Sequence, residues 1–383
     1  MTTSTSSQGG TRSGSTRSPA VGRFPTALVG SWCKPHWLAN HEMIYGHEGS
    51  WWRVGPEQLP DALDDAVLLA VRDQEKAGLT YVCDGEQRRQ TFSGHFYALG
   101  GIDSDQQGAV TDFSNDVNEF LTMKPRAVTA DADAKPTAPP KFELPRVVGP
   151  ITWGRPILAD AQLFLDRNAD RPTKATVIGP TTLALRLVDE HYGSLQDLSF
   201  ALADALNQEI KALESVGVDL IQLDEPEVHF RYSKVHEFAV EAIDRALAGV
   251  STRTGVHMCY GYAKNIAEKR ATPVYDKALE VLAATSVDEI SIEYAQPAYG
   301  PDLLTHAGDK TVTLGVLNLA TDAPVESSDD IVKMAEAAMS VTGPDRLALA
   351  PDCGMWFLPR DRALAKITAM EQAAIALRER YAL

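Results

Sequence analysis

The sequence predicts an α/β protein built as a single (β/α)8 barrel of the TIM-barrel class. Eight short apolar runs occur along the chain, and most are followed by an amphipathic stretch, the alternation of strand and helix expected of a parallel barrel. The length of 383 residues suits one large barrel. A doubly wound open sheet is the alternative, but no glycine-rich phosphate turn follows the first run, which continues as Val29-Gly30-Ser31-Trp32.

The predicted barrel begins after an N-terminal tail. Residues 1–23 are mostly Ser, Thr, Gly and Arg with almost nothing to bury, so we expect a disordered tail followed by one domain over 24–383. A second polar stretch at about 124–145 contains Lys135-Pro136-Thr137-Ala138-Pro139-Pro140, which is too rich in proline for a helix or a central strand. It is predicted to be an excursion from the barrel.

Strands and helices alternate through the rest of the chain. The predicted strands lie at about 27–31, 80–83, 174–178, 219–223, 254–258, 289–292, 311–316 and 347–350. Apolar residues at helical spacing predict a helix over about 195–216, and the same periodicity predicts helices over about 332–341 and 363–377.

The composition excludes several classes of function. The formal net charge is −16, so nucleic acids and anionic membranes are not expected partners. No apolar run approaches the roughly 18 residues of a spanning helix, and the N-terminus lacks the apolar core of a secretory signal, so we expect a cytoplasmic protein. The cysteines are too few and too scattered for a disulfide framework and are expected to be thiols; they are Cys33, Cys83, Cys259 and Cys353.

One imidazole and two thiols suggest a zinc site. His257 and Cys259 are two residues apart, so both side chains point to one face where a strand ends. Cys353 follows a different predicted strand and would have to reach them from there. A zinc site made from separate strands, with one position open to a ligand, is typical of catalysis rather than of a structural finger. The alternative is that a core histidine and two buried cysteines simply pack.

Polar residues follow most of the predicted strands. They are Ser31, Asp84-Gly85-Glu86, Asp224-Glu225-Pro226, His257 with Cys259, Glu293, Asn318 and Asp352-Cys353. In a (β/α)8 barrel the carboxyl ends of the strands meet at one rim, where active sites lie. Scattered core cysteines have no reason to fall at this rim, which favours a metal site over simple packing.

From about Ala27 to its C-terminus the chain resembles the catalytic barrel of the cobalamin-independent methionine synthases, in a short form without the additional N-terminal barrel of the long enzymes. The motifs that carry this resemblance are Val29-Gly30-Ser31, Asp84-Gly85-Glu86, Ile178-Gly179-Pro180-Thr181, Ile221-Gln222-Leu223-Asp224-Glu225-Pro226, His257-Met258-Cys259-Tyr260, Ile290-Ser291-Ile292-Glu293 and Pro351-Asp352-Cys353-Gly354. Together they are highly specific for the superfamily and much less specific for the substrate.

The resemblance implies a zinc-dependent methyltransferase. The zinc ligands of the family match His257, Cys259, Glu293 and Cys353, an anionic set that keeps a zinc-bound sulfur electron-rich. Zinc would convert the thiol of homocysteine into a thiolate that attacks the methyl carbon of a donor, which gives methionine. Glu293 would be the ligand that yields to the incoming thiol.

The resemblance also implies where homocysteine binds. Residues matching Glu86 and Asp224 hold its ammonium group, and backbone amides around Ser31 receive its carboxylate. Taken alone, Glu86 could belong to a surface ion-pair cluster with Arg88 and Arg89, and Asp224 could cap a loop. No residue is assigned as a catalytic proton donor.

The sequence departs from the long enzymes on the side of the methyl donor. Ala320 or its neighbour stands where long members carry a histidine, and Met355-Trp356-Phe357 replace a basic pair after the last cysteine. An apolar donor pocket is therefore expected, for a methylated corrinoid, a corrinoid protein or a simple folate. In addition, more residues separate Cys259 from Glu293 than in the long enzymes.

Two other functions stay open. An epoxyalkane:coenzyme M transferase would use the same zinc core with an acceptor that carries a sulfonate, for which Lys34, Arg88 and Arg89 near the mouth leave room. The retention of Glu86 and Asp224 favours an ammonium group instead. A binding protein without turnover, related to the uroporphyrinogen decarboxylase-like barrels, would not need the histidine and the two cysteines together.

Overall fold

The computed structural model describes residues 22–41, 51–110, 114–123, 143–261 and 266–382. Most of the predicted tail (1–21) and most of the predicted excursion (124–142) lie outside the described residues. Arg23, at the end of the predicted tail, pairs with Asp345 at 2.6 Å and donates to the backbone carbonyl of Tyr381 at 2.7 Å. The first described residues therefore pack against the C-terminal end of the chain.

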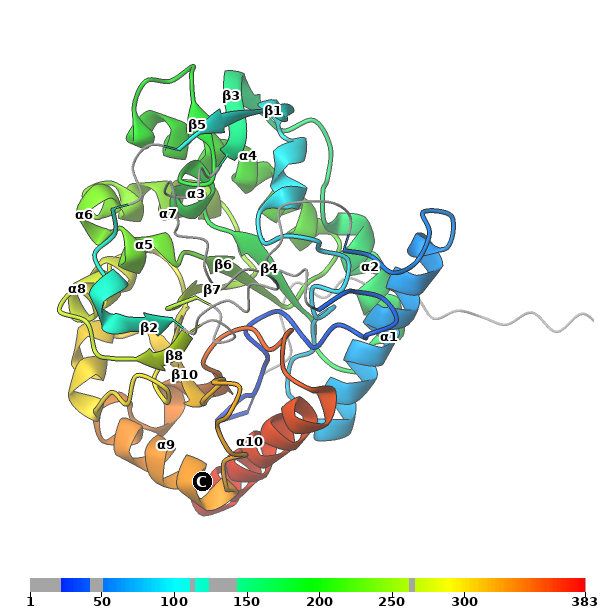
Figure 1. The fold of residues 1–383 in the computed structure, drawn as a ribbon. Coiled ribbons are helices and arrows are strands. Elements are labelled where there is room, and N and C mark those ends of the chain that lie inside the picture. The colour runs from blue at the N-terminus through cyan, green and yellow to red at the C-terminus, as the bar shows by residue number, and fades with distance from the viewer. Residues whose placement is uncertain (1–21, 42–50, 111–113, 124–142, 262–265, 383) are drawn as a thin grey trace, which may run out of the picture.

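A parallel barrel forms the core of the molecule (Figure 1). Six strands make one sheet in the order β11-β10-β9-β7-β6-β4. They are β4 (Lys174–Ile178), β6 (Leu220–Asp224), β7 (Arg253–Met258), β9 (Glu289–Ile292), β10 (Thr311–Leu317) and β11 (Leu347–Pro351). All neighbouring pairs are parallel. Each coincides within one or two residues with a predicted strand, because strands buried on both faces read as short apolar runs.

Two N-terminal segments close the barrel. Thr26 forms a parallel bridge to Leu349 of β11, and Val82 forms one to Thr173 beside β4. The backbone N–H of Tyr81 donates to the carbonyl of Thr26 at 3.0 Å, which joins the two segments to each other. Six strands and two segments thus complete a ring of eight, and the predicted (β/α)8 barrel is confirmed.

The two N-terminal segments make single bridges rather than the extended strands predicted at 27–31 and 80–83. Threonine side chains replace part of the ladder. The backbone N–H of Thr26 donates to the Thr80 hydroxyl and that of Thr80 to the Thr26 hydroxyl, each at 3.0 Å. Because these amides bond to side chains, they are not available for a regular strand pairing.

Helices surround the barrel (Figure 1). They are α1 (Leu59–Ala77), α2 (Ala159–Asn168), α3 (Pro180–Ala184), α4 (Leu195–Ser215), α5 (Glu227–Phe230), α6 (Tyr232–Val235), α7 (Ala239–Leu247), α8 (Tyr275–Ala283), α9 (Ser328–Thr342) and α10 (Arg360–Arg380), with 3₁₀ turns η1 (Gly94–Ala98), η2 (Asn118–Phe120), η4 (Pro301–Ala307) and η5 (Pro344–Arg346). The predicted helices are α4, α9 and α10. Ser194 caps α4 by accepting from the Asp197 N–H at 3.0 Å, and Leu202 and Ile210 on its apolar face are fully buried.

Two small sheets lie outside the barrel. β1 (Gly100–Ala109) pairs antiparallel with β3 (Glu143–Thr152), and β3 pairs parallel with β5 (Val188–Asp189). β2 (Leu121–Met123) pairs antiparallel with β8 (Ile266–Lys269). Figure 1 shows the first sheet at the top, beyond α3, and the second at the left. None of these strands was predicted, since the sequence of β1 is largely polar and most of it is exposed or half-buried.

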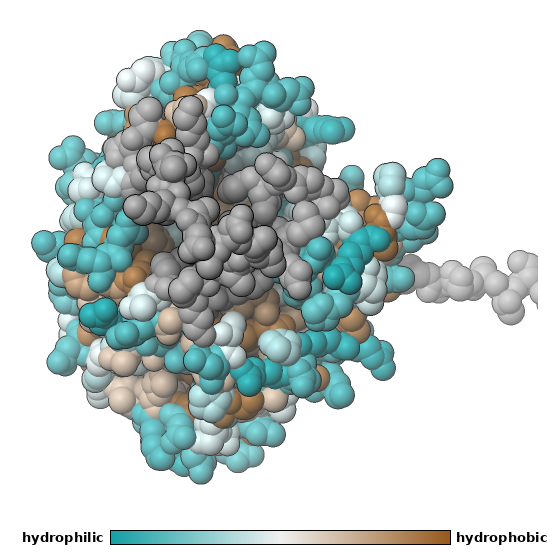
Figure 2. Space-filling view, in the orientation of Figure 1, coloured by the Kyte–Doolittle hydropathy of each residue, from teal (hydrophilic) through white to brown (hydrophobic). Residues whose placement is uncertain are grey.

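The face of the molecule that Figure 2 shows is mainly polar in its described part. In Figure 2 hydrophilic residues cover most of the described part of this face, and hydrophobic residues form only scattered patches, in keeping with the net charge of −16. Among the described helices, none combines the length and the apolar character that crossing a membrane requires.

Candidate functional site

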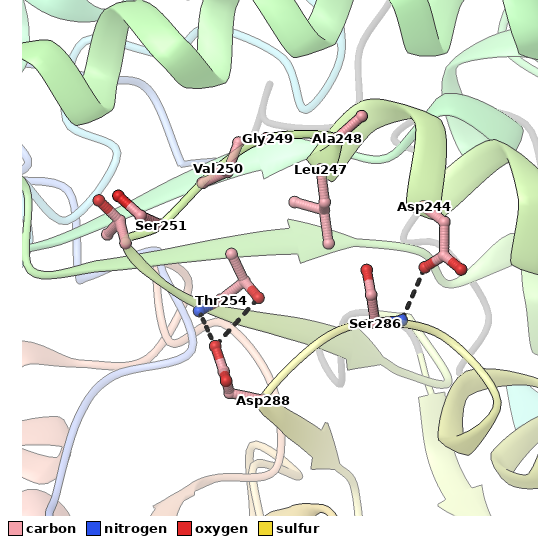
Figure 3. A pocket seen from close by; sticks show the side chains of 10 residues that line it. Asp244, Leu247, Ala248, Gly249, Val250, Ser251, Thr254, Ser286 and Asp288 are labelled. Carbon is pink, nitrogen blue, oxygen red and sulfur yellow. Dashed lines mark hydrogen bonds between the residues drawn. The ribbon is translucent and has the colours of Figure 1, made fainter.

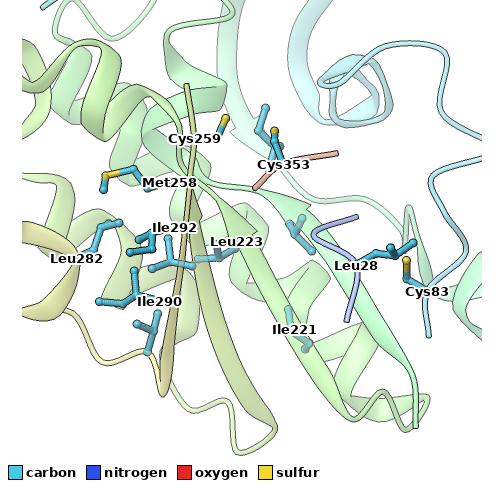
Figure 4. Close-up of a cluster of buried hydrophobic side chains, with 14 of the residues drawn as sticks. Leu28, Cys83, Ile221, Leu223, Met258, Cys259, Leu282, Ile290, Ile292 and Cys353 are labelled. Carbon is cyan, nitrogen blue, oxygen red and sulfur yellow. The ribbon is translucent and has the colours of Figure 1, made fainter. Parts of the chain in front are cut away.

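Three of the predicted metal ligands come together at the carboxyl ends of the barrel strands. His257 lies near the end of β7, Cys259 directly follows β7, and Cys353 follows β11. Their ligand atoms all lie within 4.8 Å of one another, and the residues are 2 %, 7 % and 5 % exposed. Figure 4 shows the two sulfur atoms at the same end of the strands, beyond the apolar side chains of the interior. We call these three residues the metal group.

The imidazole of His257 is held in an orientation suited to a metal ion. Its Nδ1 is 3.0 Å from the hydroxyl of Ser291, whereas its buried Nε2 has no hydrogen-bond partner among the described residues. Burial, and then the nearby ammonium of Lys174, lower the pKa of His257 to about 3. The ring is therefore neutral at physiological pH, and Nε2 can offer a lone pair while Nδ1 bonds to a neighbour, as metal-binding histidines do.

The two thiols of the metal group lie next to each other. A hydrogen bond shared with Cys259, followed by burial, raises the pKa of Cys353 well above its ordinary value. The backbone N–H of Gly261 donates to the Cys259 sulfur at 3.3 Å. A bound divalent cation deprotonates a coordinating thiol outright. The donor set of one neutral nitrogen and two sulfurs fits zinc.

The other two cysteines lie apart from the metal group. The thiol of Cys33 donates to the carbonyl of Met355 at 3.3 Å, and that of Cys83 donates to the carbonyl of Gly30 at 3.1 Å. Burial raises the pKa of Cys83 to about 12. Both are buried, protonated thiols.

The fourth expected ligand, Glu293, is buried beside the metal group but not within it. Its Oε2 forms an ion pair with Nζ of Lys269 at 2.5 Å, and its Oε1 accepts from the backbone N–H of Tyr260 at 2.8 Å. Both charged side chains are fully buried. Lys269 was not predicted from the sequence. It lies in the segment between Cys259 and Glu293, and the greater length of that segment than in the long enzymes is the feature that could have pointed to it.

Asp352 links the strand ends that carry Glu293 and Cys353. Its carboxylate accepts from the backbone N–H groups of Tyr294, Ala295 and Gln296 at 3.1, 3.0 and 2.7 Å. A carboxylate bonded to three amides holds the loop after β9 in one position. The side chain before Cys353 thus positions this cysteine relative to Glu293.

The three predicted substrate-binding residues also lie at the carboxyl ends of the barrel segments, and all are buried. Ser31, Glu86 and Asp224 are 4 %, 8 % and 5 % exposed, and the hydroxyl of Ser31 has no partner among the described residues. Burial, and then the carboxylate of Glu86, raise the pKa of Asp224 to about 7. The carboxylate of Glu86 therefore lies close enough to Asp224 to act on its protonation.

An unusual backbone conformation presents Glu86. Gly85 and Glu86 both have positive φ angles, of 64° and 54°, and only the glycine adopts such an angle without strain. Asp84 stabilises the turn by accepting from the Glu86 N–H at 2.8 Å, and buried Lys34 donates to the Glu86 carbonyl at 2.6 Å. Backbone strain that the surrounding structure holds in place is typical of functional sites.

Gly30 leaves the space that the Glu86 carboxylate occupies. A Cβ atom at position 30 would lie 2.5 Å from Oε1 of Glu86 and 3.1 Å from Cγ2 of Thr176. Thr176 also donates its hydroxyl to the same Oε1 at 3.0 Å, so the carboxylate is not free to swing away.

We therefore expect Gly30→Ala to lower the free energy of unfolding by about 1–3 kcal/mol, the usual cost of overpacking a well-packed interior. Gly154→Ala is the matched control, because a Cβ atom there meets nothing within 4 Å. Chemical denaturation of both variants measures the effect. Equal stability of the two variants would contradict this description of the packing around the Glu86 carboxylate.

The basic residues near the mouth are engaged with protein groups. Arg88 pairs with Asp64, while Arg89 is buried, contacts Oε1 of Glu86 at 3.2 Å and donates to the Thr176 carbonyl at 2.5 Å. The surface ion-pair alternative therefore applies to Arg88 and not to Arg89. The ammonium group of Lys34 donates to the carbonyls of Glu86 and Gln87, and burial lowers the pKa of Lys34 to about 7.

A separate pocket lies at the amino ends of β7 and β9 (Figure 3). Its polar groups are bonded within the protein: Asp288 accepts from the Thr254 N–H at 2.7 Å, Asp244 accepts from the Ser286 N–H at 2.6 Å, and Ser251 donates its hydroxyl to Glu214 at 2.7 Å. In barrels of this class the amino ends of the strands contribute stability, whereas the opposite rim carries the chemistry. We therefore assign no function to this pocket.

Known proteins share this barrel and cover nearly all of it. The family described as the catalytic domain of cobalamin-independent synthase matches residues 24–376. A methionine synthase of Saccharolobus solfataricus is 30 % identical over 359 residues, which cover 93 % of this chain and 95 % of that protein. A methionine synthase of Sulfolobus acidocaldarius is 29 % identical over 357 residues and 93 % of each chain.

Solved structures of methionine synthases have the same fold as this chain. A B12-independent methionine synthase from Shewanella sp. W3-18-1, in complex with selenomethionine, superposes with a TM-score of 0.79 at 28 % identity and covers 94 % of this chain and 99 % of that chain. A putative vitamin-B12 independent methionine synthase from Listeria monocytogenes shares the fold, with a TM-score of 0.66 at 20 % identity over the same shares of the two chains.

Proposed function

The chain belongs to the cobalamin-independent methionine synthase family and is a methyltransferase, and from this membership we propose that it uses zinc to transfer a methyl group to homocysteine, giving methionine. The observation that carries the proposal is the metal group, in which an imidazole nitrogen without a hydrogen-bond partner in the described part of the chain lies with two thiols within 4.8 Å. The group lies at the rim where barrel enzymes act.

His257, Cys259 and Cys353 would hold the zinc ion. Three protein ligands of this kind are typical of catalytic zinc, which keeps a further position for water or substrate. When bound there, zinc lowers the pKa of the acceptor thiol so that the thiolate is the reacting species. Glu293 would complete the four-ligand set that the resemblance implies, provided that its carboxylate leaves Lys269.

Glu86, Asp224 and Ser31 would hold the amino-acid end of homocysteine. The two buried carboxylates would pair with its ammonium group, and Ser31 with the backbone around it would receive the carboxylate. The Shewanella enzyme was solved with selenomethionine, an amino acid that has the same end groups as methionine, and this supports the same kind of ligand here. Holding both end groups orients the sulfur for reaction.

The engaged basic residues argue against a sulfonate acceptor such as coenzyme M. Lys34 and Arg89 already bond to the Glu86 loop, and Arg88 pairs with Asp64. A sulfonate would also face two carboxylates, and like charges at close range repel strongly when buried. Homocysteine is therefore the acceptor that these residues favour.

Isothermal titration of the zinc-loaded protein tests this proposal. Homocysteine and coenzyme M would each be titrated in two buffers of different ionisation enthalpy, which reports proton release. We expect homocysteine to bind with release of its thiol proton, and coenzyme M to bind far more weakly. Tighter binding of coenzyme M, or homocysteine binding without proton release, would refute the assignment.

The donor pocket is proposed to be apolar. Met355, Trp356 and Phe357 are 0 %, 8 % and 8 % exposed, and the Trp356 ring packs edge-on against Trp51 with ring centres 5.6 Å apart. Such a wall suits a flat or apolar donor, and none of these three residues carries a cation for a chain of glutamates.

We expect methyl-folate triglutamate to react little faster than the monoglutamate, and methylcobalamin to compete well with both, because an apolar wall gains nothing from additional carboxylates. Initial rates with the three donors at equal concentration, each with homocysteine, measure this. A strong preference for the triglutamate would show that cations elsewhere in the chain bind the tail.

A further inference from the structure

Lys269 and Glu293 form an ion pair that no solvent reaches, since both side chains are 0 % exposed. Lys269 is the last residue of β8, where it pairs with Leu121 of β2. The small β2-β8 sheet therefore brings a cation from outside the barrel to a carboxylate at the end of a barrel strand.

The ammonium of Lys269 has partners on the protein around it. Besides the Glu293 carboxylate at 2.5 Å, it donates to the carbonyl of Gly261 at 3.0 Å and lies 5.9 Å from the ring centre of Tyr260. Gly261 in turn donates its N–H to the sulfur of Cys259 at 3.3 Å. The ion pair is thus linked to Cys259 of the metal group through the backbone of Gly261.

Glu293 has little freedom to approach the metal group while this pair persists. The hydroxyl of Tyr275 accepts from the Glu293 N–H at 3.1 Å and donates to the Glu293 carbonyl at 3.2 Å, which fixes the backbone. Both carboxylate oxygens are engaged, one by Lys269 and the other by the Tyr260 N–H at 2.8 Å. A metal ion would have to compete with Lys269 for this carboxylate.

We infer that Lys269 is a positioning residue that holds Glu293 off the metal, so that in the resting enzyme zinc is bound by His257, Cys259 and Cys353 and a position stays open for the acceptor thiol. This inference rests on the proposed metal site. It differs from the four-ligand set of the resemblance, in which the thiol must first displace Glu293.

Three variants test the inference by metal affinity and by the visible absorption of the Co(II)-substituted protein, which reports the ligands directly. Glu293→Gln should bind zinc as tightly as the wild type and leave the Co(II) spectrum unchanged. Lys269→Met should free the carboxylate, raise zinc affinity about tenfold or more and change the spectrum. The double variant Lys269→Met/Glu293→Gln should return both readouts to the wild-type values.

The double variant also controls for the case in which Lys269→Met does not fold. Lys269→Met alone leaves a buried carboxylate unpaired until metal binds, whereas removal of both charges is often tolerated. A pair that only stabilises the fold would alter the melting temperature of these variants and leave metal affinity and the spectrum of Lys269→Met unchanged, which would refute the inference.

Weaker zinc binding by Glu293→Gln, about tenfold or more, would equally overturn it, because Glu293 would then be a ligand in the resting enzyme. Cys259→Ser separates this failure from failure of the site itself. If Cys259→Ser keeps its zinc, the proposed metal site is wrong; if it loses zinc and Glu293→Gln does too, only the role of Lys269 is wrong.

Discussion

Replacing Cys259 or Cys353 with serine will remove most of the zinc from the purified protein and abolish methyl transfer, while the barrel remains folded. Structural zinc sites bind zinc with about 10–16 kcal/mol in total, and for a site with three protein ligands we expect the loss of one ligand to cost at least about 3 kcal/mol, or roughly a hundredfold in affinity. The barrel survives because its closed ring of strands and its helices bury a continuous apolar core that does not depend on metal.

Metal content of the purified variants and their circular dichroism measure the two parts of this prediction. Cys33→Ser and Cys83→Ser are the matched controls. Both cysteines are buried and donate to backbone carbonyls, at 3.3 and 3.1 Å, which a serine hydroxyl can also do. The controls should keep their zinc. Full zinc retention by both Cys259→Ser and Cys353→Ser would refute the metal site.

The barrel could be predicted because its strands leave a strong local signal. Residues 174–178, for example, are all buried, and parallel strands covered on both faces are short apolar runs that turn residues interrupt. The outer sheets leave no such signal. β1 runs over Gly100–Ala109, is mostly polar and has irregular pairing with β3, so neither alternation nor apolarity marks it as a strand. Tertiary contacts decide its conformation.

Part of the candidate site could be predicted because histidine and cysteine imply metal binding by their own chemistry. Residues whose role depends on an ion-pair partner could not be predicted. His257 and Cys259 lie at the end of β7 and Cys353 follows β11, and the barrel topology brings the ends of these two strands to one rim. Lys269 and Arg89 are charged residues that sequence patterns assign to the surface. Their burial depends on Glu293 and Glu86, which are distant in sequence or held in an uncommon turn.

Glu86→Gln and Asp224→Asn will each weaken the binding of homocysteine far more than the binding of 4-mercaptobutanoate. This second thiol has the same thiol and carboxylate groups but no amino group. Removing one carboxylate that pairs with a buried ammonium should cost on the order of 2–5 kcal/mol of binding. The two carboxylates share their environment, since Glu86 helps to raise the pKa of Asp224, so the double variant should lose less than the sum of the single losses.

Titration calorimetry of the zinc-loaded variants with both thiols measures the two losses of affinity. The difference between them is the contribution of the ammonium group. Glu371→Gln is the control, because Glu371 is also a buried carboxylate with a cationic partner, Arg378 at 2.7 Å, but it lies beside Thr26 at the start of the first barrel segment. It should leave both affinities unchanged. Equal losses for the two thiols in Glu86→Gln and Asp224→Asn would mean that these acids do not contact an ammonium group, and would favour an acceptor without one, as in the epoxyalkane:coenzyme M transferases.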